Sequence, residues 1–292
     1  TTAWKKTNTA LPQFNIELMK ENTAKTPEWI HFGAGNIFRG FIAPLQQKLL
    51  DKGLAKTGII AADTFDSEII EKIYKPFDNL ALLVTMCADG SLEKSVIASA
   101  AEAYQAAPQN KPHWENLKAI FKAPSLKMVS FTITEKGYLL KNAAGVMMPG
   151  VEDDFAAGPV LPKSYIGKVV TLLHERFANG ELPVAMVSMD NCSHNGDKLY
   201  AAVREFAEEW ENRGVCKPGF LAYINDESKV TFPWTMIDKI TPRPDAKVEK
   251  ILADDGIEQL EPVITSKKTY VAPFVNAEEV QYLVIEDKLS ED

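Results

Sequence analysis

The 292-residue sequence contains little cysteine, no long apolar run and no excess of positive charge. Its three cysteines are too few and too scattered for a disulfide framework, and no Cys/His spacing resembles a structural zinc site. No apolar stretch approaches the roughly 20 residues that cross a bilayer. The net charge of -8 argues against a broad nucleic-acid-binding face. We therefore expect a cytoplasmic protein without a metal site, a membrane partner or a nucleic-acid partner.

The strongest local pattern lies in residues 28–41, where a short apolar run leads through a glycine turn into helical spacing. Glycines let the backbone turn tightly and approach a diphosphate, and the helix N-terminus directs N–H groups at it. The pattern predicts a dinucleotide site. Its candidate residues are Gly33, Ala34, Gly35, Asn36, Ile37, Phe38 and Arg39.

This glycine motif is incomplete, since Phe38 stands where the third glycine of the full fingerprint falls. A glycine pair after a strand also occurs in tight turns that hold no ligand. Arg39 has two equal interpretations, a contact with the pyrophosphate or a solvated surface charge. The strand before the turn and the helix after it favour the cofactor interpretation.

Asp63 ends the second predicted strand, residues 58–63. An acidic residue at this place accepts hydrogen bonds from the ribose hydroxyls of a bound dinucleotide. It also repels a 2′-phosphate and so favours NAD over NADP. The alternative is a cap on the helix that follows, and the two roles are compatible.

Two later strands also end in polar residues. Ligands of open α/β sheets lie beyond the carboxyl ends of the strands, so Thr132, Thr134 and Glu135 are predicted near the nicotinamide. Asp190 and Asn191 follow another strand, and the Asn191 amide suits an alkoxide or carbonyl oxygen because it is a neutral donor. An ordinary exit from strand to loop would use the same residue types.

Strands alternate with helices along most of the chain, which predicts an α/β fold of the doubly wound Rossmann type with a mostly parallel sheet. Leu80 to Met86 and Leu92 to Ala98 flank Asp89-Gly90 and predict an inserted β-hairpin. We expect an N-terminal wrapping segment at 1–27, a cofactor-binding domain at 28–244, and a strand-like extension at 245–292.

Four motifs in order give the chain a family resemblance. They are Gly33 to Phe41, Thr132 to Tyr138, Ser188 to Gly196, and Phe232 to Pro242. Together they resemble the long-chain polyol and hexuronate dehydrogenases, which include mannitol 2-dehydrogenase, fructuronate reductase and tagaturonate reductase. The resemblance runs from about residue 28 to 288.

The resemblance implies an expanded Rossmann domain followed by a helical C-terminal domain. It also implies metal-independent hydride transfer between NAD(P) and a polyol or aldonate, or the matching ketose or ketouronate. Under it, Asn191 helps to hold the reacting oxygen, Asp190 belongs to the same motif, and Asp238 either touches substrate or braces the Asn191 loop.

One family motif is missing. The general base of the family is a lysine that stands five residues before an Asn and eight before a His, and no lysine here does so. Gln105, Ile166 and Met186 occupy the positions eight residues before three of the histidines. We therefore expect a cofactor domain that binds NAD but has little activity alone. A missing C-terminal domain or a partner chain is expected to cover its exposed face.

Two other classes of function remain open at this point. A nucleotide-binding or regulatory module that no longer catalyses would also lack the lysine. An adenosylmethionine-dependent methyltransferase shares the glycine turn and the acidic second strand, but the motifs at 188–196 and 232–242 argue against it.

Overall fold

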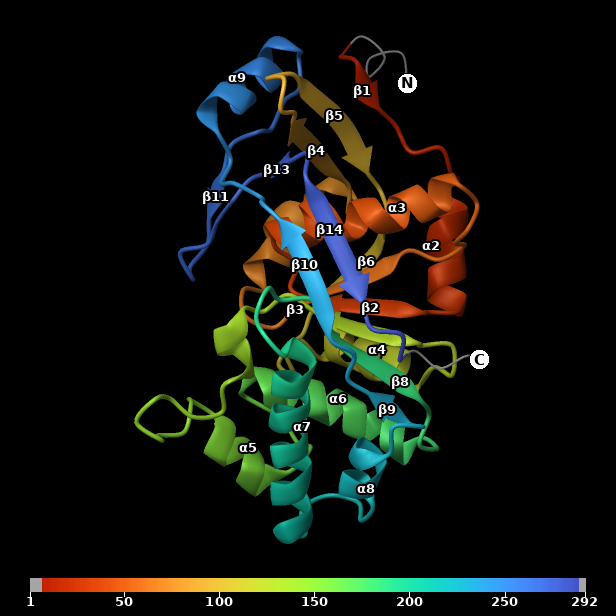
Figure 1. The fold of residues 1–292 in the computed structure, drawn as a ribbon, viewed down its shortest axis with the longest axis vertical. Coiled ribbons are helices and arrows are strands. Elements are labelled where there is room, and N and C mark those ends of the chain that lie inside the picture. Colours follow the sequence, from red (N-terminus) through yellow and green to blue (C-terminus); the bar gives the residue numbers. More distant parts are fainter. Residues whose placement is uncertain (1–6, 289–292) are drawn as a thin grey trace. The chain divides into compact units, whose positions relative to one another are not determined.

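The computed structural model describes residues 7–288, and the chain forms two compact units (Figure 1). The first unit holds the segment up to residue 25 together with residues 33–103 and 238–282. The second holds residues 26–32, 104–237 and the segment from residue 283. The units are interleaved in sequence, so neither corresponds to one continuous stretch of chain.

The second unit is built on parallel strands that lie in the order β2 (Trp29–Phe32), β7 (Met128–Phe131), β8 (Val184–Ser188) and β9 (Val230–Thr231). The strands β7 and β8 are almost fully buried and mostly apolar, as expected for a parallel sheet covered by helices. The predicted α/β class with a mostly parallel sheet is confirmed.

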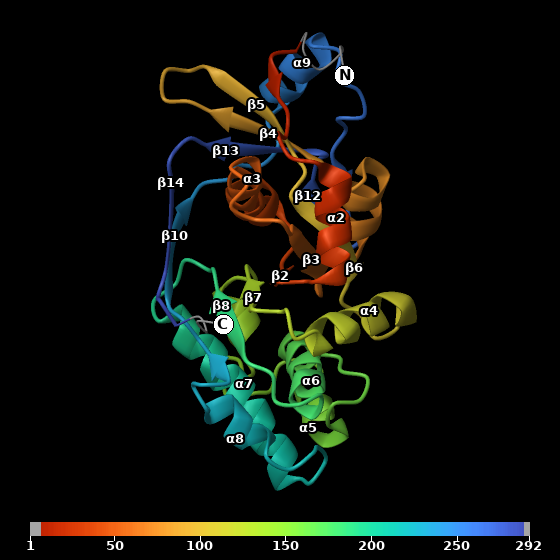
Figure 2. The same cartoon turned by 90° about the vertical axis from the view of Figure 1, so that its right-hand side faces the viewer.

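The second unit also contains helices (Figures 1 and 2), some of which bury aromatic side chains in a common core. They are α4 (Lys111–Lys122), α5 (Val151–Ala157), α6 (Tyr165–Ala178), α7 (Asn195–Asn212) and α8 (Phe220–Asn225), with the short turn η4 (Glu135–Tyr138). Phe177, Phe206, Trp210 and Phe220 are all buried in that core. The helix α7 packs against α6 and begins directly after the 190–194 loop.

The first unit contains β3 (Ile59–Asp63) beside β6 (Ala100–Gln105). Its helical segments are α2 (Ile16–Lys25), the π-helical turn η1 (Phe38–Ile42), α3 (Ala43–Asp51), and the turns η2 (Ile70–Tyr74) and η3 (Lys75–Phe77). The chain passes from η1 into α3 without a break, so the predicted helix after the glycine turn is present.

A second sheet in the first unit has the order β1 (Thr9–Ala10), β5 (Leu92–Ile97), β4 (Ala81–Met86) and β13 (Phe274–Glu278). The strands β4 and β5 pair antiparallel through the turn at 89–90, which confirms the predicted hairpin. β13 joins β4 in parallel from a point far later in the chain.

The region after residue 244 was expected to be strand-like, and this prediction is partly wrong. Residues 246–254 form the helix α9 (Ala246–Asp254), whose first N–H groups are capped by the Asp245 carboxylate. The other elements there are strands: β11 (Val263–Ile264), β12 (Tyr270–Val271), β13 and β14 (Gln281–Ile285). The strand β10 (Thr235–Lys239) lies before this region.

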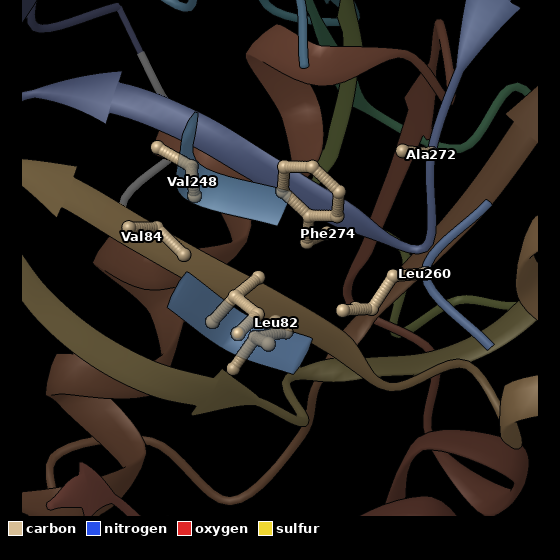
Figure 3. Packing of buried hydrophobic residues seen from close by; sticks show 7 residues of the cluster. Leu82, Val84, Val248, Leu260, Ala272 and Phe274 are labelled. Carbon is tan, nitrogen blue, oxygen red and sulfur yellow. The ribbon is translucent and has the colours of Figure 1, made fainter. Parts of the chain in front are cut away.

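The helix α9 is stabilised by burial of Val248 and Leu252 in an apolar cluster with Leu82, Val84 and Phe274 (Figure 3). Leu260 and Ala272 complete the buried set. Each fully buried side chain of this size stabilises the fold by roughly 1.5–3 kcal/mol. Within residues 7–288, no helix is long and apolar enough to cross a membrane.

Candidate functional site

The glycine turn lies in the first unit and connects to β3 through two hydrogen bonds. Gly33 has φ 119°, a conformation that favours glycine, and its N–H donates to the carbonyl of Ala62 at 2.9 Å. The next amide, that of Ala34, donates to Oδ2 of Asp63 at 3.1 Å. The Tyr74 hydroxyl donates to the Ala34 carbonyl at 2.9 Å, so the turn is held on both sides.

Asp63 is buried at the end of β3 and binds backbone on both of its oxygens. Besides the Ala34 amide on Oδ2, its Oδ1 accepts the N–H groups of Phe65 and Asp66 at 2.9 and 2.7 Å. Burial raises the pKa of Asp63, and these N–H donors oppose that shift. The side chain thus caps the turn after β3 and also fixes the position of the glycine turn.

The backbone of Gly35 is open on the side where a side chain would project. A Cβ placed there meets no atom within 4 Å. The N–H of Arg39 donates to the carbonyl of Gly35 at 3.1 Å, so the helix starts directly at this glycine. The neighbouring Asn36 has a buried Oδ1 without a hydrogen-bond partner in the part of the chain that the structure describes. The turn therefore combines an open backbone, a helix start and an unsatisfied polar atom.

Phe38 and Arg39, the next residues of the motif, are buried. The Arg39 guanidinium is 2% exposed and donates to the carbonyls of Ala272 and Phe274 at 2.8–3.0 Å. Arg39 is therefore no solvated surface charge. Its hydrogen bonds anchor η1 to the segment that enters β13.

In the second unit, the Asp190 carboxylate joins three elements. Its oxygens accept the N–H groups of Ile133 and Thr134 at 3.0 and 2.8 Å and the Tyr138 hydroxyl at 2.5 Å. Tyr138 also lies 2.7 Å from the Ser188 hydroxyl. Burial raises the pKa of Asp190 although its hydrogen-bond donors act in the opposite direction. Asp190 thus links the end of β8 to the loop after β7.

Asn191 follows Asp190 and is exposed. The loop that carries it is fixed by Asn195, whose Nδ2 donates to the Asp190 carbonyl at 3.0 Å and to the Thr235 hydroxyl at 2.8 Å. The Asn195 Oδ1 accepts the Thr235 N–H at 3.0 Å. Asn191 therefore presents its amide to solvent from a loop whose neighbours are held firmly.

The other predicted residues of this unit have different surroundings. Thr132 is half-buried, with its hydroxyl 2.9 Å from Nε2 of His31. Glu135 is exposed and forms an ion pair with Lys198 on α7 at 2.6 Å. Thr134 is exposed, and its backbone has φ 66° and ψ 157°. Asp238, a residue of the first unit, is exposed on β10.

Comparison with known proteins identifies the family of the chain. The model of the mannitol dehydrogenase Rossmann domain matches residues 27–291. The chain belongs to the mannitol dehydrogenase family. A D-mannonate oxidoreductase of Thermotoga maritima is 48% identical over 285 residues, 98% of this chain and 52% of that protein. A D-mannonate oxidoreductase of Escherichia coli is 30% identical over 77% of this chain and 45% of its own length.

Solved structures of this family share the fold. Mannitol 2-dehydrogenase of Pseudomonas fluorescens, solved as a ternary complex with NAD and D-mannitol, superimposes with a TM-score of 0.76 at 25% identity. It is matched over 98% of this chain and 53% of its own. A D-sorbitol dehydrogenase in substrate-free form gives the same TM-score at 26% identity, covering 98% and 54%. The chain thus spans about half the length of the relatives it matches.

Three residues that the sequence did not single out prove central to the geometry. Tyr74 holds the glycine turn, while Tyr138 and Asn195 hold the Asp190 loop. Tyr138 and Asn195 lie inside the motifs that carry the family resemblance, so motif membership was the available signal. Tyr74 stands 40 residues after Ala34, and no local pattern marks it.

Proposed function

We propose that the chain is the cofactor domain of an NAD-dependent oxidoreductase that interconverts a polyol or aldonate with the matching ketose or ketouronate. The observation that carries this proposal is the open backbone of Gly35 at a helix start, in a chain of the mannitol dehydrogenase family. The solved relative that contains NAD and D-mannitol supports the choice of cofactor.

The residues of the first unit suit a dinucleotide. The absence of any atom near a Cβ on Gly35 leaves room for a diphosphate to approach the backbone. The turn residues Gly33, Ala34, Gly35, Asn36 and Ile37 would line the diphosphate, whereas the unpartnered Oδ1 of Asn36 is an acceptor and would bind a ligand hydroxyl rather than a phosphate oxygen. Phe38 and Arg39 would support the turn indirectly, by keeping the helix in place.

Asp63 is proposed to receive the adenosine ribose. Its carboxylate already fixes the Ala34 amide, so the group that shapes the turn would also accept the ribose hydroxyls on its remaining lone pairs. A carboxylate at this place repels a 2′-phosphate. This charge argument favours NAD over NADP.

NAD supplies the hydride acceptor when it is bound. On the protein side, the exposed amide of Asn191 would donate to the reacting oxygen and stabilise the negative charge that develops there. Thr132, Thr134 and Glu135 would border the nicotinamide. Asp238 would contact substrate or brace its loop.

The relatives support a proposal for the substrate class. The D-mannonate oxidoreductase at 48% identity favours an aldonate and ketouronate pair over mannitol and fructose.

The catalytic lysine motif of the family is absent from this sequence, which supports the proposal that the chain alone is inactive. A further domain or partner chain would cover the exposed apolar residues Trp234, Met236 and Val284 of the second unit. We place this activity in the cytoplasm.

Titration of the chain with NADH, followed by nicotinamide fluorescence, tests the proposal. Gly35→Val should weaken NADH binding by at least about tenfold because the added side chain fills the space for the diphosphate. Ligand-free thermal unfolding should change little, since this space is open in the structure. Ala143→Val, at an exposed loop residue of the second unit, is the matched control and should bind like the wild type.

Three outcomes contradict the proposal. Equal NADH affinity of the wild type and Gly35→Val would mean that the turn does not hold the diphosphate. Binding of adenosylmethionine in preference to NADH would favour the methyltransferase alternative. A chain that binds NADH but stays inactive when the rest of the polypeptide is added would favour the non-catalytic module.

A further inference from the structure

Thr134 has a backbone conformation that residues with a side chain rarely adopt. Its φ of 66° and ψ of 157° fall in a region that is essentially reserved for glycine. The β-branched side chain of threonine makes this conformation still less favourable. Such a residue persists only where its surroundings enforce its geometry, and strained residues of this kind concentrate at functional sites.

The group that enforces it is the Asp190 carboxylate. Oδ1 accepts the Thr134 N–H at 2.8 Å, and Oδ2 accepts the N–H of the preceding Ile133 at 3.0 Å. Hydrogen bonds from successive amides to one carboxylate fix the orientation of the peptide plane between them. These bonds are charge-assisted and therefore stronger than ordinary backbone hydrogen bonds.

Asp190 is itself held from two other directions. The Tyr138 hydroxyl donates to its Oδ2 at 2.5 Å and contacts the Ser188 hydroxyl. The Asn195 amide holds its main-chain carbonyl. Both carboxylate oxygens therefore accept hydrogen bonds from the protein. Asp190 binds the backbone of Thr134 through its side chain and is joined to the backbone of Asn191 through its own main chain.

We propose that Asp190 is a positioning residue that, with Tyr138, holds Thr134 in its strained conformation and so sets Thr134 and Asn191 for hydride transfer. This inference rests on the proposed function. It assigns to Asp190 a task that differs from contact with substrate, and it adds Tyr138 to the residues on which turnover depends.

A double-mutant cycle in the enzyme that contains the complete polypeptide tests the inference. Asp190→Ala should lower kcat by about 10–100-fold with a smaller change in KM, because the geometry of the reacting groups is lost. Glycine adopts the Thr134 conformation without strain. In the Thr134→Gly background, whatever the effect of that change alone, Asp190→Ala should therefore cost less than about threefold.

Two further variants keep the test informative if Asp190→Ala folds poorly. Asp190→Asn retains one acceptor oxygen and should lose less activity than Asp190→Ala, again with rescue by Thr134→Gly. Tyr138→Phe removes the hydroxyl alone and should reduce kcat by about three- to tenfold. A merely structural role would lower the melting temperature without this selective rescue of kcat.

The outcomes separate the two proposals. An active wild-type enzyme in which Asp190→Ala costs the same factor in both backgrounds would overturn the inference, because Asp190 would then act directly on substrate or cofactor. A complete wild-type enzyme that neither binds NADH nor oxidises aldonates or polyols would overturn the proposed function, and the inference with it.

Discussion

His31 shows how single buried polar residues define the strand ends. It is fully buried in β2, with Nδ1 2.7 Å from the Ser130 hydroxyl and Nε2 2.9 Å from the Thr132 hydroxyl. Burial lowers the pKa of His31 from 6.5 to about 3. The imidazole is therefore neutral in the folded protein at every ordinary pH, and it ties β2 to the end of β7.

The lowered pKa makes stability depend on pH. Below pH 6.5 the unfolded chain binds a proton at His31 that the folded chain does not, so the free energy of unfolding falls as the pH falls towards 3. Between pH 7 and pH 5 this loss amounts to about 2 kcal/mol. Urea unfolding of the wild type and of His31→Gln at pH 7 and pH 5 measures it, because the variant cannot titrate. Equal losses in both proteins would contradict the assignment.

At the scale of single residues, the sequence predicted candidate site positions but not all of their contacts. Gly33, Gly35 and Asp63 carry a local pattern, and both interpretations of Asp63 were compatible from the start. The cap on the turn at 65–66 is now visible in its hydrogen bonds, while its contact with ribose stays a prediction. The burial of Arg39 depends on carbonyls more than 230 residues away, and no local pattern contains that information.

Among the elements, the start of α7 depends on a close approach between two backbones. A Cβ on Gly196 would lie 2.5 Å from the Phe232 carbonyl oxygen and 2.9 Å from that of Pro233. This contact places the segment at 195–196 directly against the Phe-Pro segment at 232–233. It also brings α7 close enough for Asn195 to bind Thr235.

Gly196→Ala should destabilise the protein, although helix propensity alone predicts the opposite. Propensity alone favours alanine over glycine by about 1 kcal/mol. The contact with backbone oxygens should instead destabilise the protein by about 1–3 kcal/mol, as overpacking does. Thermal or urea unfolding measures the change. The reverse substitution at an exposed position of the same helix, Ala201→Gly, should cost about 1 kcal/mol and serves as the control.

Stabilisation by Gly196→Ala would show that the two backbones leave room for a methyl group between them.

The helix α9 was not predicted from the sequence. The helical spacing of Val248 and Leu252 was present in the sequence, but the region was expected to be strand-like. The buried cluster with β4 and β13, which stabilises the helix, comes from residues far away in the chain.

For the whole molecule, the division into two units separates the groups on which the proposed chemistry depends. The glycine turn, Asp63 and Asp238 belong to the first unit, while Thr134, Asp190 and Asn191 belong to the second. The sequence predicted one continuous cofactor-binding domain at 28–244, and that boundary stays a proposal. Interleaved units arise from long-range pairing such as β13 with β4, which sequence periodicity does not reveal.

The complete polypeptide should be required for turnover. The chain of 292 residues should bind NADH but oxidise D-mannonate and D-mannitol at least about a hundredfold more slowly than a polypeptide with the family's second half, because a positioned general base contributes typically 10²–10⁴-fold. Steady-state assays that follow NADH absorbance measure both proteins. Comparable turnover by the two would show that the base lies within this chain.

The hydrogen bonds of Arg39 also set an order of events during synthesis. The guanidinium lies in η1, beside the glycine turn, and its acceptors at Ala272 and Phe274 are added 233 and 235 residues later. A chain grows at about 5–20 residues per second, so the ribosome needs roughly 10–50 seconds to supply them. Until then these hydrogen bonds of the arginine cannot form, which delays the final packing of the glycine turn until the segment 272–274 has been made.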